Sequence, residues 1–248
     1  MRRRFFVEKF EAERAYLRGE AAEHLGRVLR AQRGQLYELS DGENLWLGRV
    51  ENISRERGGP IEFALVEKLP ATAPRLKIRL LLSIFKFDRF EWCLEKATEL
   101  GIAEIAPLAA ARSERALVLA APKRSQRWSK ILRESAQQSR GLRPPALTTA
   151  VSAEEAFRAA NERLKILFSE RAEAPPLRKV LHGETANDIC LAIGPEGGWT
   201  EDEFARAAQA GFREASLGRE ILRAETAVIA ALAVLRFTLG ENPSSETE

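Results

Sequence analysis

The first third of the chain alternates short apolar segments with turn residues. Three segments have the pattern of β-strands: residues 36–39, 45–50 and 61–66. Between the first two, residues 40–43 contain the Asp-Gly pair that is typical of a hairpin turn. Residues 20–30 have helical spacing, and their apolar stripe consists of Leu25, Val28 and Leu29. Several short strands with one helix predict a barrel-like β domain over residues 1–70.

After a proline-containing linker at residues 69–74, the pattern changes to strands that alternate with helices. Strands are expected at residues 77–84, 104–107, 164–168 and 188–193, and helices at residues 89–100, 125–139, 152–160 and from Thr200 onward. This alternation is typical of an α/β domain with a mostly parallel sheet. We therefore predict a two-domain α/β protein whose second domain spans residues 75–240, followed by a disordered polar tail at residues 241–248.

The last fifth of the chain contains two glycine-containing loops, each beside a helix. The first, residues 194–198, follows a strand, and the second spans residues 217–226. Glycine backbone lets a small ligand approach closely, so the two loops predict a ligand pocket. Neither loop has the Gly-x-x-x-x-Gly-Lys-Ser/Thr or the Gly-x-Gly-x-x-Gly pattern, so the P-loop and dinucleotide-binding classes lack their motif.

Helix-capping signals bear on the choice of ligand. Thr200 and Glu203 have the spacing of a capping box, as do Ser152 and Glu155, and Gly101 is suited to a C-cap. The first turn after Thr200 carries three acids, which suit the helix dipole but oppose a phosphate at the same place. The pocket therefore favours a ligand that is neutral or cationic near its reacting end, and S-adenosylmethionine, with its sulfonium, fits.

Polar residues precede an apolar helix in the second loop. Residues 227–235 are apolar on every side, which predicts a buried helix. Arg223, Glu225 and Thr226 lie at its start, and buried polar groups need partners. Those partners are either one another or a bound cofactor and substrate. Glu196 in the first loop also has two interpretations: it faces a ligand, or it accepts amides of its own turn.

Composition narrows the class of protein. The 248 residues are 45% hydrophobic and 30% charged, as in soluble globular proteins. No apolar run reaches the ~18 residues of a membrane span, and the first residues lack the pattern of a signal peptide. Cys93 and Cys190 lie among apolar neighbours, so we expect buried, reduced thiols and a cytoplasmic protein. Two cysteines and two distant histidines, His24 and His182, support no metal site.

Basic residues gather in two stretches although the net charge is only +3. Between residues 123 and 143 seven basic residues accompany one acid, and five more lie between residues 75 and 89. Such runs predict a surface that binds a polyanion, and the alternative is a solvated helix face.

Four regions of the sequence, in order, resemble a known family. They contain HLGRVLR (residues 24–30), KFDRFEW and KATELG (86–92 and 96–101), ESAQQSR (134–140), and IGPEGG with LGREILRAETA (193–198 and 217–227). Together they resemble the ribosomal RNA small subunit methyltransferase E family of the knotted SPOUT class. Phe87 stands where that family usually has Gly, and Ser135 stands where Ala is frequent, which affects local loop shape.

The resemblance implies a function and a fold. It implies methylation of N3 of one uridine in 16S rRNA of the small ribosomal subunit, with S-adenosylmethionine as cofactor. It also implies a PUA-like N-terminal barrel that binds RNA, a C-terminal SPOUT domain with a trefoil knot threaded by residues 194–239, and a homodimer.

The resemblance further implies roles for individual residues. The expected cofactor-binding residues are Leu167, Ser169, Glu170, Ile193, Gly194, Glu196, Gly197, Gly198, Leu217, Gly218, Ile221, Leu222 and Thr226. As catalytic residues, Glu225 or Glu196 would accept the proton of uracil N3, and Arg223 or Arg140 would stabilise the uracil anion.

Basic side chains supply the expected RNA contacts. These are Arg3, Arg4, His24, Arg27, Arg30, Lys86, Arg89, Arg112 and Arg140. His24 either stacks on a base or is an ordinary surface histidine. Two rival functions stay open: a ribose 2′-O-methyltransferase of the same class, and a non-catalytic RNA-binding protein. A nucleotide hydrolase is disfavoured because the P-loop lysine is missing.

Overall fold

Separate hydrophobic cores divide the chain into two compact units. This computed structural model describes residues 3–54, 56, 58–72 and 74–240, so the expected disordered tail at 241–248 lies outside the described residues. The first unit contains Met1–Ala73 and Arg133–Pro144, and the second contains Pro74–Leu132 and Pro145–Glu248. Nothing in the hydrophobic pattern had indicated that residues 133–144 return to the first unit.

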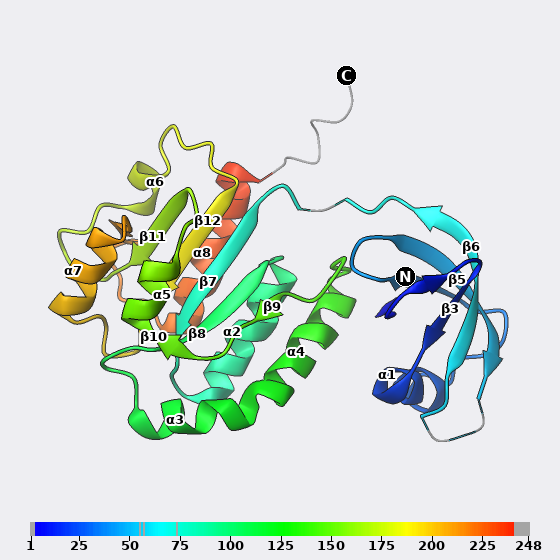
Figure 1. Ribbon diagram of the computed structural model, residues 1–248. Coiled ribbons are helices and arrows are strands. Elements are labelled where there is room, and N and C mark those ends of the chain that lie inside the picture. The colour runs from blue at the N-terminus through cyan, green and yellow to red at the C-terminus, as the bar shows by residue number, and fades with distance from the viewer. Residues whose placement is uncertain (1–2, 55, 57, 73, 241–248) are drawn as a thin grey trace. The chain divides into compact units, whose positions relative to one another are not determined.

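The first unit is built on a six-stranded sheet in the order β1-β4-β5-β6-β3-β2. Its strands are β1 (Arg4–Phe6), β2 (Phe10–Glu11), β3 (Arg14–Leu17), β4 (Leu36–Ser40), β5 (Leu45–Ile53) and β6 (Ile61–Leu69). β1 pairs with β4 in parallel, and the other neighbours are antiparallel. Figure 1 shows the sheet curled, and Leu39, Val50 and Phe63 are fully buried in its core. The expected strands are confirmed, and the barrel-like domain is a curled sheet.

A π-helical segment changes the helix expected at residues 20–30. α1 (Gly19–Glu23) continues into η1 (His24–Val28), where the Leu29 N–H donates to the His24 carbonyl at 3.0 Å. Because a π turn contains an extra residue, later positions are rotated relative to an α-helix. Leu25 is fully buried but Val28 is 65% exposed, so the expected apolar stripe is wrong at Val28.

The second unit contains a parallel sheet in the order β10-β8-β7-β12-β11-β13, with β9 beside β8. Its strands are β7 (Lys77–Ser83), β8 (Glu104–Ala109), β9 (Ala146–Leu147), β10 (Val151–Ser152), β11 (Leu164–Phe168), β12 (Asp188–Ile193) and β13 (Arg213–Ala215). These pairings are parallel, as expected for an α/β domain. The helices are α2 (Phe87–Glu99), α3 (Arg115–Ala120), η2 (Ala121–Arg124), α4 (Ser125–Gln138), α5 (Ala153–Ala159), α6 (Leu177–Val180), α7 (Glu201–Gln209) and α8 (Ala224–Leu239).

Helices cover both faces of this sheet, as Figure 1 shows. On β7, Leu80 and Leu82 point into a core shared with α2 and α8, whereas Leu81 points into a core shared with α5 and α7. Successive side chains of a strand point to opposite faces. A strand covered on both faces therefore needs the continuous apolar run that predicted β7.

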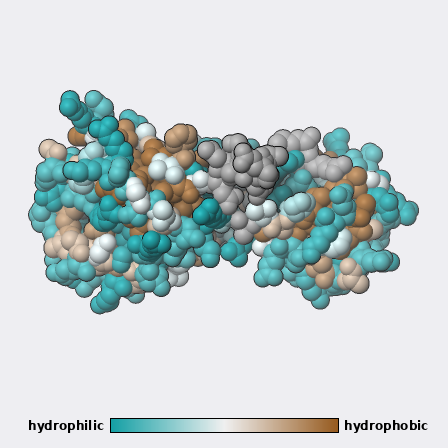
Figure 2. Space-filling view, turned by 90° about the horizontal axis from the view of Figure 1, so that it is seen from above, coloured by the Kyte–Doolittle hydropathy of each residue, from teal (hydrophilic) through white to brown (hydrophobic). Residues whose placement is uncertain are grey.

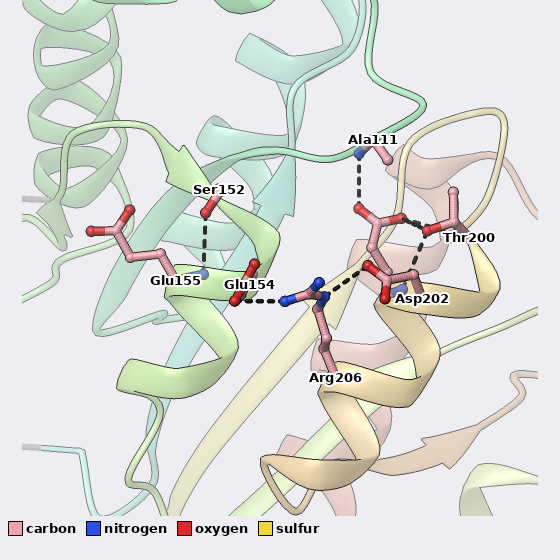
Figure 3. Close-up of polar contacts among 8 residues, drawn as sticks. Ala111, Ser152, Glu154, Glu155, Thr200, Asp202 and Arg206 are labelled. Atoms are coloured by element: carbon pink, nitrogen blue, oxygen red, sulfur yellow. Dashed lines mark hydrogen bonds and ion pairs between the residues drawn. The ribbon is translucent and has the colours of Figure 1, made fainter.

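Local signals at helix ends are confirmed in part. The Thr200 hydroxyl accepts from the Glu203 N–H, and the Glu203 carboxylate accepts from the Thr200 N–H at 2.9 Å, so the capping box of α7 is complete. At α5, Ser152 accepts from the Glu155 N–H at 3.2 Å, but the Glu155 carboxylate points away (Figure 3). The capping box expected at α5 is therefore only half formed.

α8 is not buried on every side, contrary to expectation. Val228, Ala231 and Leu232 are fully buried, but Val234 is 38% exposed and Phe237 is 88% exposed. Figure 2 shows hydrophobic surface gathered in patches on a mostly hydrophilic molecule. A helix whose outer face is apolar has the same all-apolar sequence pattern as a helix that is buried on every side. Within the described ranges no helix is long and apolar enough to cross a membrane.

Gly101, which follows α2, is hydrogen-bonded to Arg236 of α8, and this contact should affect the stability of the protein. It has φ +72°, as expected for a C-cap, and its carbonyl accepts from Arg236 Nη2 at 2.9 Å. A Cβ on Gly101 would lie 2.0 Å from Arg236 Nη2, whereas Gly183, at φ +75°, has nothing within 4 Å. The left-handed conformation should cost either alanine variant about 1–2 kcal/mol. Gly101→Ala should lose a further ~1–3 kcal/mol from the clash.

The measurement is denaturant unfolding followed by tryptophan fluorescence, since Trp92, Trp128 and Trp199 all lie in the second unit. Gly183→Ala is the matched control for backbone strain alone. Equal losses of unfolding free energy in the two variants would show that Arg236 does not fix the end of α2.

Candidate functional site

Three loops meet at the carboxyl end of the parallel sheet. They follow β11, β12 and β13, which are adjacent in the sheet. In open α/β sheets ligands bind outside the carboxyl ends of the strands. The loops line a cavity of about 500 Å³. That volume is within the ~300–1,000 Å³ that is usual for small-molecule sites.

The cavity brings together most of the residues expected to bind the cofactor. Those that line it are Ser169, Glu170, Ile193, Gly194, Glu196, Gly197, Gly198, Leu217, Gly218, Ile221 and Leu222. Leu167 and Thr226 do not line it. Leu167 packs in the core shared with α5 and α7, and Thr226 is exposed on α8. Both lie one residue from a lining position, because alternate residues of an element point in different directions.

Sequence analysis missed the aromatic wall of the cavity, Phe168, Trp199 and Phe204. Trp199 is buried, and its Nε1 donates to the Phe168 carbonyl at 3.0 Å. A Cβ on Gly194 would lie 3.0 Å from the Trp199 ring. Gly194 is therefore needed for close packing of its own turn. The position of a tryptophan between the glycine turn and the helix cap was the available signal.

Glu203 fixes the loops around the cavity. Its carboxylate accepts from the Thr200 N–H and hydroxyl at 2.9 and 3.0 Å, and from the Ala111 N–H at 2.8 Å (Figure 3). The next residue, Arg112, donates to the Gly197 carbonyl at 2.8 Å. A buried carboxylate with these donors is satisfied. It ties the loop after β8 to the start of α7, and that loop in turn supports the glycine turn.

The charges around the cavity are balanced. Four glutamates line it, Glu170, Glu196, Glu201 and Glu220, and so do four arginines, Arg112, Arg171, Arg219 and Arg223. Arg171 also lies 3.6 Å from Glu201. The three acids of the first turn of α7 therefore do not make the cavity acidic, and charge alone does not exclude a phosphate. The lining instead suits a ligand that carries both signs of charge.

Arg89 lies between the two carboxylates expected to serve as a base. Its Nη1 is 2.5 Å from Glu196 Oε1, and its Nε is 3.8 Å from Glu225 Oε1. The Glu225 side chain is 15% exposed and lies outside the cavity lining, whereas the Glu196 side chain is 47% exposed and part of it. Arg89, expected to contact RNA, therefore orients Glu196.

The two arginines expected to stabilise the uracil anion lie in different units. Arg223 is exposed, precedes α8 and lines the cavity. Arg140 belongs to the first unit, where its Nη2 is 3.8 Å from Glu38 Oε1. Buried polar groups were expected at the start of α8, but Arg223 and Thr226 are exposed there. Of the three polar residues, only Glu225 is largely buried and needs a partner.

The other residues expected to contact RNA differ in accessibility. Arg3, His24, Arg27, Arg30, Lys86 and Arg112 are exposed. The Arg4 side chain is 11% exposed and bonded to Glu38 at 2.9 Å. In the basic stretch, Arg124 and Arg127 pair with Glu91 at 3.5 and 2.8 Å. Part of the basic charge is therefore neutralised within the protein.

Both cysteines are free and fully buried, as expected. Burial raises the pKa of the Cys93 thiol to about 12, with a smaller contribution from the Glu225 carboxylate. Burial also raises the pKa of the Cys190 thiol. Neither thiol is a nucleophile near neutral pH. Among the described residues no group of three or more His, Cys, Asp or Glu side chains is placed to hold a metal ion.

Comparisons with known proteins identify a matching family and relatives of this chain. A family model described as an RNA methyltransferase domain matches residues 72–236. The ribosomal RNA small subunit methyltransferase E of Synechocystis is 33% identical, over 87% of this chain and 70% of its own. That of Bacillus subtilis is 27% identical, over 94% of this chain and 96% of its own.

A solved structure agrees with the sequence relatives. The crystal structure of the Neisseria gonorrhoeae ribosomal RNA small subunit methyltransferase E bound to S-adenosyl methionine has a TM-score of 0.86 and 30% identity, and the match covers 97% of this chain and 99% of that one. The family model covers the second unit, and the relatives and the solved structure extend over both units. The chain therefore belongs to the ribosomal RNA small subunit methyltransferase E family.

Proposed function

We propose that this protein transfers a methyl group from S-adenosylmethionine to N3 of a uridine in 16S rRNA of the small ribosomal subunit. The observation that supports it best is the three-loop cavity at the carboxyl end of the sheet, at whose lining Glu196 is held by Arg89. The relative from Neisseria gonorrhoeae is bound to S-adenosyl methionine, and it shares this fold. A ribosomal RNA substrate also implies a cytoplasmic location.

The residues present fit S-adenosylmethionine. The aromatic and aliphatic wall suits the adenosine, and the balanced charges suit a sulfonium and an amino acid moiety that carries both signs. Gly218, at φ +147°, has nothing within 4 Å of a Cβ position, so its backbone is open to a ligand. When bound, the cofactor supplies an electrophilic methyl group. Glu225 and Thr226 do not line this cavity.

The protein's own residues supply orientation and a proton acceptor. Uracil N3 must lose its proton, and of the two carboxylates expected to serve as base, Glu196 lines the cavity and Glu225 does not. Arg89 holds Glu196 and, through its second contact, Glu225, which makes Glu225 a positioning residue. Arg223 lines the same cavity and is placed to stabilise negative charge on the base.

We also infer a homodimer. Phe237, Val234 and Ile221 expose 88%, 38% and 77% of their surfaces on or beside α8. Val234 and Phe237, three residues apart on α8, form an exposed apolar pair of the kind found at protein interfaces. A second copy of the chain is the partner that the family resemblance implies.

The reaction is tested by incubating the protein with S-adenosylmethionine and small ribosomal subunits that lack the modification, followed by nucleoside mass mapping of the 16S rRNA. We expect 3-methyluridine at one position. A 2′-O-methyl nucleoside would instead support the ribose methyltransferase. Cofactor binding by calorimetry without any methylated nucleoside would count against both.

Two isosteric variants separate the candidate bases. Glu196→Gln should retain cofactor affinity within a few fold and lose about 10²-fold or more in kcat, because it removes the proton acceptor. Glu225→Gln should lose less than about tenfold, since Arg89 still binds Glu196. Single-turnover methyl transfer measures both rates. The reverse ranking would transfer the role of base to Glu225.

An exposed aromatic residue tests the dimer. Phe237→Glu places a charge in the apolar surface of α8 and should shift the protein towards the 27.7 kDa monomer in sedimentation velocity. Leu119→Glu is the matched control, because Leu119 is 68% exposed on α3. A dimer that survives Phe237→Glu, or a wild-type monomer, would refute this interface.

A further inference from the structure

A second, smaller cavity adjoins the first. Its volume is about 190 Å³. Arg112 and the turn residues Pro195, Glu196 and Gly197 line both cavities. The rest of its wall comes from residues 84–86, between β7 and α2, and from Ser113, Glu114 and Leu117, at the start of α3. It is smaller than the ~300–1,000 Å³ of usual small-molecule sites, so it suits a single ring.

The wall of this second cavity contains hydrogen-bonding groups without a structural role. The Ser113 hydroxyl is buried and has no hydrogen-bond partner among the described residues. Lys86 is exposed and immediately precedes α2. Buried hydroxyls are nearly always paired, so an unpaired one in a cavity wall has a free hydrogen-bonding position that a ligand can fill. Phe85 and Leu117 add apolar surface on which a planar ring can pack.

We propose that the second cavity receives the target uracil ring, an inference that rests on the proposed uridine methylation. Uracil presents an N–H donor at N3 between two carbonyl acceptors. The cavity offers the complementary set, with Ser113 and Lys86 as donors and the Glu196 carboxylate as acceptor. Cytosine has an acceptor at N3 and a donor at C4, so it would leave these groups mismatched.

The position of Glu196 in both cavity walls connects binding to the reaction. The N3 proton passes to the Glu196 carboxylate, and the N3 electron pair forms the bond to the methyl carbon. The carbon–sulfur bond breaks, and its electron pair remains on sulfur. Reacting atoms must approach to about 3–3.5 Å. Adjoining cavities with one shared turn meet this requirement without a large rearrangement of the second unit.

The first test locates the ring directly. A 16S rRNA substrate carrying 4-thiouridine at the methylated position is bound to the full-length protein and irradiated, and the cross-linked peptides are identified by mass spectrometry. We expect cross-links within residues 84–86 or 112–117. Cross-links confined to other segments would overturn the proposal.

The second test is kinetic. Ser113→Ala should lower kcat/KM for the RNA about tenfold and leave the Kd for S-adenosylmethionine unchanged, because Ser113 lines only the second cavity. Ser83→Ala is the matched control, since the Ser83 hydroxyl is also buried and unpaired but lines neither cavity. Leu117→Trp fills the cavity and should reduce methylation about 100-fold or more at unchanged cofactor affinity.

The outcomes separate this inference from the function on which it rests. If the wild-type protein forms no 3-methyluridine, both fail. If it forms 3-methyluridine while Ser113→Ala matches Ser83→Ala and Leu117→Trp retains full activity, only the second cavity is refuted. Loss of RNA kinetics in Ser113→Ala and Leu117→Trp with an intact cofactor Kd supports it.

Discussion

Burial of the central strands on both faces is the constraint on which the site depends. Leu191, Ala192 and Ile193 of β12 are at most 3% exposed, and they pack alternately against the helices on either face. Such strands leave side-chain surface for a ligand only at their carboxyl ends, where Phe168 and Ile193 line the cavity. Most ligand-facing groups therefore come from the loops at strand ends, and three neighbouring parallel strands place three such loops together.

Loops that bind a ligand must be held in place by something other than the sheet. Here Glu203 has this role, because one buried carboxylate accepts hydrogen bonds from two segments that are 89 residues or more apart in sequence, at Ala111 and Thr200. Charge-assisted hydrogen bonds of this kind are among the stronger ones. Glu203 thereby fixes the position of Arg112, and Arg112 holds the carbonyl of Gly197.

The fold was largely predictable because it depends on local pattern. Strand and helix positions followed from apolar spacing. Both hydrogen bonds of the capping box predicted at Thr200 are present. Errors arose where the pattern does not encode the answer. An extra residue per turn in η1 exposes Val28, and the apolar sequence of α8 does not distinguish side chains buried in the core from exposed ones such as Phe237. The trefoil knot stays a prediction.

The site was predictable at the level of loops but not of partners. Glycine turns identified which segments gather, yet the reason for Gly194 is the Trp199 ring beneath it, and a Cβ on Gly197 would lie 3.4 Å from Arg112. Spacing in sequence also could not place Arg89 beside Glu196, since they are separated by 107 residues. Long-range pairs of this kind depend on the order of strands in the sheet.

The glycine turn lies beside two cavities. Residues 195–197 form part of the wall of two cavities, so any bulky side chain there would fill one cavity or separate the two. Glu196 is the one long side chain in this segment, and Arg89 holds it by a contact that comes from α2. If the two cavities hold the cofactor and the target base as proposed, a shared wall with little side-chain volume brings the two ligands close together, which direct transfer requires.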